Sequence, residues 1–273
     1  MILIMGMLSD LSPIMCALLA TTFTWASTAL GASLVFFINT VNKKAFDTML
    51  GFTGGVMMAA SFFSLLNPSI ALSKETGLMR VVPSLVGFVL GGLFLWVLDK
   101  VTPHLHINNE MSEAEGIKTD WHGTTLLVLA ITLHNIPEGL AVGILFGGAA
   151  MGLEGTSFQA AMTLAIGIAI QNFPEGAAVS LPLRRQGISK SKSFFYGQLS
   201  AVVEPIAGVV GAMMVVEMSY ILPYALAFAA GAMIYVIVEE VIPESQKNNY
   251  TNSATLGFMF GFAIMMVLDV GLS

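Results

Sequence analysis

The sequence is short of charged residues. Charged side chains make up 10% of its 273 residues, against about 25% in soluble domains. Hydrophobic residues make up 56%, and the mean hydropathy is +0.82. This composition excludes a soluble globular protein and predicts an all-α integral membrane protein. The 27 glycines suit helices that pack closely in lipid.

Cysteine and clustered basic residues are also scarce. Cys16 is the only cysteine, which excludes a disulfide within the chain and a cysteine cluster for zinc. The 11 Lys and Arg residues form no basic patch, so nucleic acid is not expected as a partner. The motif H-E-x-x-H, typical of zinc-dependent hydrolases, does not occur.

Long apolar runs, by contrast, fill most of the chain. Eight of them are long enough for helices of about 20 residues, the length that crosses the apolar core of a bilayer. The whole chain, 1–273, is therefore expected to form a single polytopic membrane domain. The expected spans are 13–38, 46–66, 82–102, 123–148, 157–182, 193–216, 220–242 and 253–271.

Lys and Arg are distributed unevenly between the loops. The loops after odd-numbered spans hold nine of them, whereas the loop after span 2 holds only Lys74 and Arg80. Because positively charged loops stay in the cytoplasm, both termini are expected outside. The longest loop, residues 103–122, is then cytoplasmic. Helical spans favour an inner (plasma) membrane, since outer-membrane spans are β-barrels.

A six-residue motif occurs twice, on consecutive spans. HNIPEG covers residues 134–139 and QNFPEG covers residues 171–176. In each, His134 or Gln171 precedes a glutamate by four residues, which places both side chains on one helix face. The proline between them removes a backbone N–H, bends the helix and leaves a carbonyl without its donor. Two neighbouring copies would offer suitable ligands to a divalent cation.

Three glutamates are expected at one depth near the middle of the membrane: Glu138, Glu175 and Glu204. A charge there costs at least about 2.5–3.5 kcal/mol on insertion scales, so its presence needs a reason. Three neighbouring carboxylates repel one another unless a cation lies among them. A divalent metal is therefore the preferred interpretation. Met57, near mid-depth of span 2, would add a thioether ligand, although most methionines here are expected to pack.

At these residues the chain resembles a known family. HNIPEG and QNFPEG, with VVEP on span 6 and VEEVIP on span 7, are similar to motifs of the ZIP (Zrt/Irt-like) metal transporters. GGVMMAASFFSLLNP and GFAIMMVLDVG most resemble the bacterial GufA-type branch. The resemblance covers essentially the whole chain. It implies import of zinc, often also of cadmium, iron or manganese, as a transported substrate and not as a cofactor.

The resemblance also implies a two-metal centre in the bundle of spans 2, 4, 5 and 6. Asn172 stands where family members often have an aspartate, which removes one negative charge from the second site. The first site would comprise Met57, His134, Glu138, Gln171, Glu175 and Glu204, and the second Asn135, Asn172, Glu175 and Glu204, with Glu138 shared. For Asn135, hydrogen bonding between helices is an equal alternative.

Polar residues near the ends of spans match a metal route in the family. Solvation at the membrane interface is the open alternative, since charges are readily tolerated there. The release route would comprise Asp47, Asp99, His104, His106, Glu239 and Glu240, and the outer entrance Asp269. The expected partners are the transported ion and the lipid bilayer, and the chain is expected to act as a homodimer or a monomer.

Two other functions remain as alternatives. An intramembrane metallohydrolase would need a general-base glutamate beside its metal, but the pairs here are H-x-x-x-E and Q-x-x-x-E. A proton-coupled transporter of another solute would use the acids as a proton relay. Import of metal is preferred because the polar motif is duplicated around its proline.

Overall fold

The computed structural model describes residues 11–38, 42–73, 76–103, 116–117, 123–153 and 155–272. Within these ranges the chain is helical and contains no strand. Eight of its helical segments are long and apolar enough to cross a membrane. The all-α class and the number of candidate spans are thereby confirmed. The membrane boundaries and the side on which the termini lie stay predictions.

Several spans consist of more than one helical piece. Spans 1 to 4 are α2 (Pro13–Ala32) with η1 (Ser33–Phe36); α3 (Lys43–Ala60) with η2 (Ser61–Leu66) and α4 (Asn67–Ala71); η3 (Gly77–Val81) with α5 (Val82–Val101); and α6 (Gly123–Ala150). Spans 5 to 8 are α7 (Phe158–Arg185); α8 (Lys190–Leu199) with α9 (Val203–Glu217); η5 (Ser219–Ile221) with α10 (Leu222–Val236), η6 (Ile237–Val241) and α11 (Ile242–Gln246); and α12 (Thr251–Leu272).

Four helices begin at a polar residue that caps their first turn. The side chains of Ser12, Asn42, Ser157 and Ser189 each accept a hydrogen bond from the backbone N–H three residues further on. Such caps satisfy donors that have no partner within the helix. The polar separators between apolar runs therefore also define where the helices begin.

Two spans change their helix type next to a proline. The π-helical stretches η2 and η6 end directly before Asn67-Pro68 and Ile242-Pro243. Proline cannot donate to the helical ladder, so the turn before it widens. In η6 the wider turn carries two consecutive acids, Glu239 and Glu240, and both line one cavity.

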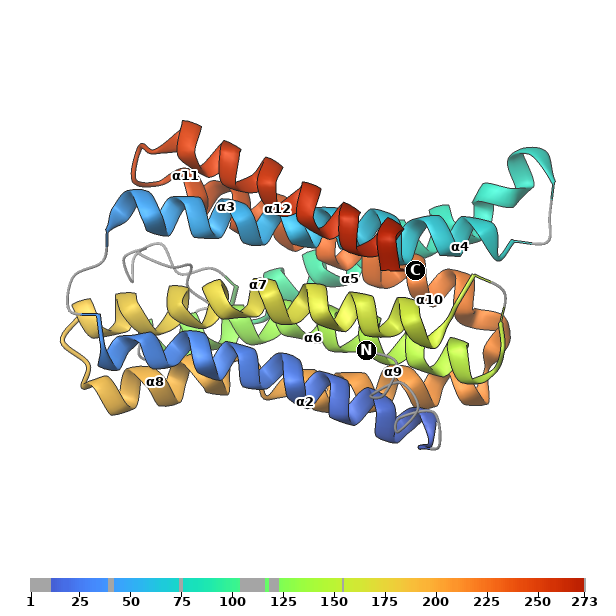
Figure 1. Ribbon diagram of the computed structural model, residues 1–273, viewed down its shortest axis with the longest axis horizontal. Helices are drawn as coiled ribbons and strands as arrows, with labels where there is room; N and C mark the ends of the chain where they lie inside the picture. Colours follow the sequence, from blue (N-terminus) through green and yellow to red (C-terminus); the bar gives the residue numbers. More distant parts are fainter. Residues whose placement is uncertain are drawn as a thin grey trace.

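The helices pack in four close pairs (Figure 1). α3 lies along α12, α5 along α10, α2 along α7 and α6 along α9. In span numbers these pairs are 2 with 8, 3 with 7, 1 with 5 and 4 with 6. Suppose that spans 1, 2 and 3 exchange places with spans 6, 7 and 8 in that order, and span 4 with span 5. The pair 2 with 8 then becomes 7 with 3, and 1 with 5 becomes 6 with 4, so the set of pairs is unchanged. The π-helical stretches obey the same exchange, as expected for an inverted internal repeat.

Glycine allows each of these pairs to approach backbone to backbone. A Cβ atom on the glycine would lie about 2 Å from a carbonyl oxygen of the partner helix, closer than any real contact. The four positions are Gly55 (1.9 Å from Phe258 O), Gly91 (2.0 Å from Phe228 O), Gly143 (2.0 Å from Gly208 O) and Gly176 (2.0 Å from Thr28 O). Small residues of this kind are typical of helix pairs in membranes.

Candidate metal centre

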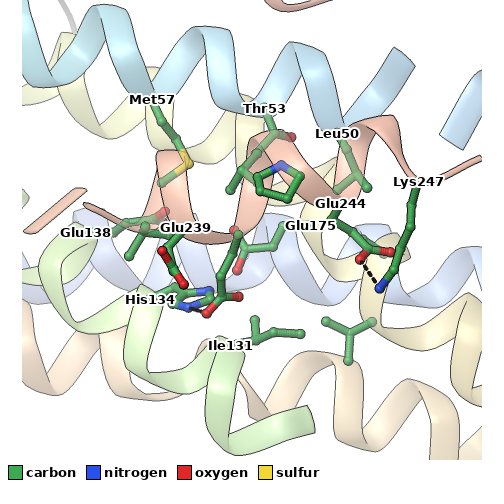
Figure 2. A pocket seen from close by; sticks show the side chains of 16 residues that line it. Leu50, Thr53, Met57, Ile131, His134, Glu138, Glu175, Glu239, Glu244 and Lys247 are labelled. Carbon is green, nitrogen blue, oxygen red and sulfur yellow. Dashed lines mark hydrogen bonds and ion pairs between the residues drawn. The ribbon is translucent and has the colours of Figure 1, made fainter. Parts of the chain in front are cut away.

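A cavity of about 400 Å³ lies between α3, α6, α7 and the segment from α10 to α11. Figure 2 shows acidic side chains from three of these segments turned toward one another beside Met57. The cavity brings together six of the residues expected to bind or conduct metal: Met57, His134, Glu138, Glu175, Glu239 and Glu240. They combine a thioether, an imidazole and carboxylates, a set that suits a transition metal.

The two copies of the motif supply the innermost ligands of this cavity. α6 and α7 are continuous helices through Pro137 and Pro174. His134 and Glu138 line the cavity one turn apart on α6, and Glu175 faces them from α7. Glu138 lies close enough to Glu175 and Glu204 for their charges to interact. The three glutamates expected at one depth are therefore near neighbours.

Five buried oxygens on the two motifs accept no hydrogen bond. They are Asn135 Oδ1, Glu138 Oε1, Glu138 Oε2, Gln171 Oε1 and Glu175 Oε1. The side-chain amides of Gln171 and Asn135 approach Glu138 and Glu175, but no described donor meets hydrogen-bond geometry at these oxygens. A buried polar atom without a partner is costly. All five atoms are acceptors, so a metal ion would satisfy them, as would donors such as water.

Glu204 lies in a different environment from Glu138 and does not line the cavity. Its Oε1 accepts a hydrogen bond from Asn172 Nδ2 at 2.8 Å, and its Oε2 accepts one from the Thr24 hydroxyl. Asn172 Oδ1 in turn accepts from Gln171 Nε2 at 2.6 Å. These residues form a polar cluster that joins spans 1, 5 and 6, and we call it the Glu204 cluster.

Asn135 has a bonding role that the sequence left open. Span 6 is interrupted between α8 and α9, where Pro205 cannot donate to the helical ladder. Asn135 Nδ2 donates to Ser200 O at this break, at 3.2 Å, and to Ile131 O at 3.0 Å. Its amide therefore connects α6 to the interrupted span, while its Oδ1 is one of the five oxygens without a donor.

The residues expected on a metal route are dispersed. Glu240 pairs with His134 Nε2 inside the cavity, and Asp99 lies with both around a smaller adjoining cavity. Asp47 is fully buried and accepts from Asn248 Nδ2 at 2.7 Å, so it is not solvated at an interface. Asp269 accepts a hydrogen bond from the hydroxyl of Ser64, a residue that is distant from it in the sequence. His104 and His106 lie outside the described residues.

The described side chains do not form a ready-made cage. In the part of the chain that the structure describes, no group of three or more His, Cys, Asp or Glu side chains is close enough to hold a metal ion by itself. A metal at the motifs would therefore need the Met57 thioether or amide oxygens as further ligands.

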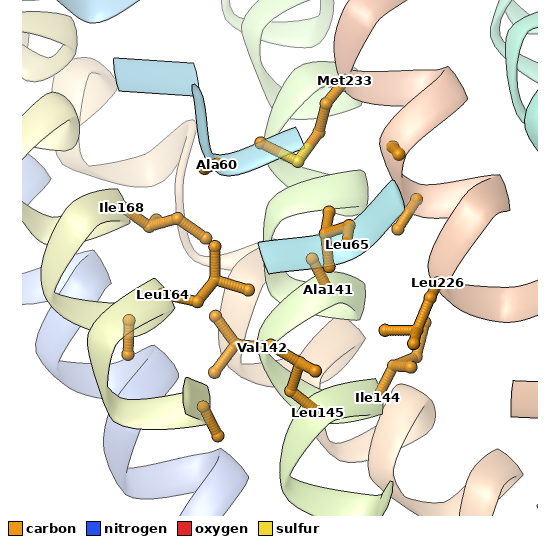
Figure 3. Close-up of a cluster of buried hydrophobic side chains, with 14 of the residues drawn as sticks. Ala60, Leu65, Ala141, Val142, Ile144, Leu145, Leu164, Ile168, Leu226 and Met233 are labelled. Atoms are coloured by element: carbon orange, nitrogen blue, oxygen red, sulfur yellow. The ribbon is translucent and has the colours of Figure 1, made fainter. Parts of the chain in front are cut away.

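Apolar packing closes the space beyond Met57. Figure 3 shows side chains of α3, η2, α6, α7 and α10 meeting in one buried cluster. On α3, Ala60 of the cluster follows Met57 of the cavity, and on α6, Ala141 follows Glu138. The cavity thus extends from Met57 and Glu138 only toward the opposite end, where Glu244 pairs with Lys247 at 3.2 Å.

Four residues of these sites were not expected from the sequence. Thr53, Glu244 and Lys247 line the cavity, and Thr24 belongs to the Glu204 cluster. Thr24 had one usable signal, because Thr21, Thr24 and Thr28 share one face of an otherwise apolar span. All three are fully buried. From the sequence, Lys247 is expected only as a charged residue of a loop. Its position beside the cavity depends on how α11 ends.

The fold and the cavity define a class: a polytopic helical membrane protein that buries acidic side chains around an internal cavity. The profile of the ZIP Zinc transporter family matches residues 109–269, more than half of the chain. Similar proteins include Zinc transporter ZIP11 of Bos taurus, 41% identical over 97% of this chain and 100% of the relative. Zinc transporter GufA of Myxococcus xanthus is 38% identical over 93% and 98%, and Zinc transporter ZIPB of Bordetella bronchiseptica is 36% identical over 94% and 81%.

The chain therefore belongs to the ZIP zinc transporter family. The resemblance inferred from the two motifs is confirmed, including the likeness to the GufA-type branch. Family and relatives are named for zinc transport, which agrees with the preferred interpretation over the two alternatives.

Proposed function

We propose that this chain imports a divalent transition metal, zinc in the first place, toward the cytoplasm. The proposal rests above all on the five buried acceptor oxygens of the two motifs, which a metal ion would satisfy. The names of the relatives, all zinc transporters, support zinc as the substrate. The metal would lie at Glu138 and Glu175, with Met57 and His134 completing its ligands.

This ligand set explains how the ion would be bound and then released. A mixture of carboxylate, imidazole and thioether is looser than a closed Cys/His zinc site, so cadmium, iron and manganese are expected as further substrates. The ion would exchange its water for these ligands in steps. His134 contacts Glu240, so the next carboxylate along the cavity is already beside the first ligands. Binding must remain weak enough for the ion to leave.

The shape of the cavity gives the site access from one side. It is closed beyond Met57 by apolar packing and extends toward Lys247. Lys43, Arg185 and Lys190 mark the same end of the bundle, which the distribution of Lys and Arg assigns to the cytoplasm. The structure then corresponds to a state that is open inward. The pairs α3–α12 and α5–α10 border the cavity opposite α2–α7 and α6–α9, so sliding between these two groups would alternate access.

The membrane in which the chain lies and its partners follow from the same reasoning. We place the chain in an inner (plasma) membrane, as a multi-pass protein whose partners are lipid and the transported ion. A homodimer stays a prediction. No catalytic residue is proposed, because the carboxylates act here as ligands.

Zinc uptake into proteoliposomes tests this proposal. Glu175→Gln keeps the size of the side chain but removes its charge, and should lower uptake by at least about tenfold, the scale on which zinc-site changes act. Glu217→Gln is the matched control, since Glu217 is an exposed carboxylate at the end of α9. Monodisperse protein on size exclusion would show that both variants fold.

Three outcomes can be distinguished. Uptake that needs Glu175 but not Glu217 supports a metal transporter with its site at the motifs. Equal uptake by wild type and Glu175→Gln would mean that the site lies elsewhere. Uptake of an organic solute without any metal binding would favour the proton-coupled alternative.

A further inference from the structure

The Glu204 cluster contains a buried carboxylate that is fully hydrogen-bonded without any cation. Glu204 has no exposed surface. One of its oxygens accepts from the Asn172 amide and the other from the Thr24 hydroxyl. The Thr24 hydroxyl also lies 2.9 Å from Thr21 O, but a carboxylate is the stronger acceptor for its single proton. Neutral donors therefore satisfy both oxygens of this acid.

Asn172 is held in the orientation that this requires. Its Oδ1 accepts from Gln171 Nε2 at 2.6 Å, and its Nδ2 donates to Thr24 O at 3.2 Å as well as to Glu204. Every polar atom of the Asn172 side chain thus has a partner. If the side-chain amide of Asn172 were turned over, its Oδ1 would face Thr24 O and Glu204 Oε1, which are both acceptors. All three hydrogen bonds of this side chain would then be lost. The N–H groups of Asn172 accordingly point at the atoms that would otherwise bind a cation.

Glu138 shows the opposite arrangement only a short distance away. Neither of its oxygens accepts a hydrogen bond, although it too is fully buried. Two buried carboxylates in one centre thus have contrasting partners. Glu138 has unused lone pairs facing a cavity with an imidazole and a thioether. Glu204 has its oxygens occupied and lies outside that cavity.

We propose that Asn172 and Thr24 take the place of a second metal ion at Glu204, so that each chain binds one transported metal ion, at Glu138 and Glu175. This inference rests on the proposed function for the nature of the ion. Asn172 and Thr24 are positioning residues, which hold Glu204 away from the metal. Gln171 and Asn172 each present N–H groups to this cluster, and N–H groups do not bind metal.

Metal content of the purified protein in detergent tests the stoichiometry. After equilibration with zinc and removal of excess, elemental analysis should find one zinc per wild-type chain and none per Glu138→Gln chain. Asn172→Asp replaces the donor with a carboxylate that faces Glu204. Because a metal ion relieves the repulsion between two facing carboxylates and competes there with a shared proton, this variant should bind two zinc ions per chain at neutral pH. A wild-type count of two, or a count of one that Asn172→Asp leaves unchanged, would overturn the inference.

The role of Thr24 has a matched control on its own helix. Thr21 is equally buried, and its hydroxyl donates to Ala17 O, within α2, at 2.6 Å. Thr24→Val frees one oxygen of Glu204 for the metal, so KM for zinc uptake and the maximal rate should both fall, by up to about tenfold. Thr21→Val should change neither. Misfolding would lower the amount of active protein without lowering KM, and equal kinetics for the two variants would contradict the role of Thr24.

The same preparations separate this inference from the proposed function. Wild-type protein that binds one zinc but carries none into liposomes would contradict import and leave the stoichiometry intact. Wild-type protein that binds two and transports zinc would contradict the stoichiometry alone. A count of zero for wild type would overturn the stoichiometry, and zinc uptake by the same protein would decide on import.

Discussion

Met57 contributes the only sulfur atom among the described residues that line the cavity. Thioethers favour soft cations such as cadmium over hard ones such as manganese. Met57→Leu conserves volume and should cost less than about 1.5 kcal/mol of stability. We expect it to weaken the competition of cadmium against labelled zinc uptake by about tenfold, while the competition of manganese changes little.

Met233→Leu provides the control for this change. Met233 is as deeply buried as Met57, at 1% and 2% exposed, and both belong to the apolar cluster, but only Met57 also lines the cavity. Substitution of Met233 should leave the order of the metals unchanged. If Met57→Leu affected cadmium and manganese alike, the thioether would be a packing group only.

Among single residues, the sequence predicts the charged ligands far better than their neutral partners. Glu138 and Glu175 stand out because a charge in an apolar run is expensive and because the motif repeats. Thr24 does not, since a threonine in an apolar helix most often donates to its own backbone, as Thr21 does. That Asn172 donates to Glu204 depends on how span 5 is turned toward span 6, which spacing along one helix does not determine.

Close glycine contacts hold the paired helices together, and Gly143 is the clearest example. A Cβ there would lie 2.0 Å from Gly208 O and 2.9 Å from Ala212 N, both backbone atoms of α9. Because neither atom can move by rotating a side chain, Gly143→Ala must push α9 away from α6. We expect a loss of about 1–3 kcal/mol, seen as a lower midpoint of thermal unfolding in detergent.

Gly271 is the matched control for this prediction. It also lies on a helix, α12, but a Cβ there would meet nothing within 4 Å. Gly271→Ala should therefore leave stability unchanged or raise it by up to about 1 kcal/mol, because alanine favours helix. Equal unfolding midpoints for the two variants would show that the pair α6–α9 tolerates separation.

The elements themselves were predicted well in number and poorly in detail. Apolar runs and polar separators predict eight spans, since length and hydropathy suffice for that. The prolines at positions 68, 205 and 243 mark places where a helix is disturbed, but not the result. Pro68 and Pro243 follow a π-helical stretch, whereas Pro205 follows an interruption of the helix at Ser200. Which of these occurs depends on neighbours such as Asn135, which donates to the backbone carbonyl of Ser200 at the interruption.

For the whole molecule, the arrangement of spans gives the two sides of the membrane different properties. One end of the cavity is closed by packed apolar side chains, and the other extends to Lys247. The state described here opens to the cytoplasm if the end near Lys247 faces that side, as the nine Lys and Arg residues of the odd-numbered loops predict. Whether this state is open inward or outward thus depends on topology, which neither the helices nor their packing determines.

Cysteine labelling would determine that topology. Cys16 is buried and should react little, so single cysteines can be added to the natural chain. Met79 is exposed on η3, the first piece of span 3, and Gln186 is exposed after span 5. In right-side-out vesicles, a membrane-impermeant maleimide should label Met79→Cys at once and Gln186→Cys only after the membrane is permeabilised. The reverse pattern would turn the closed end of the cavity toward the cytoplasm, and the state described here would then be open to the outside.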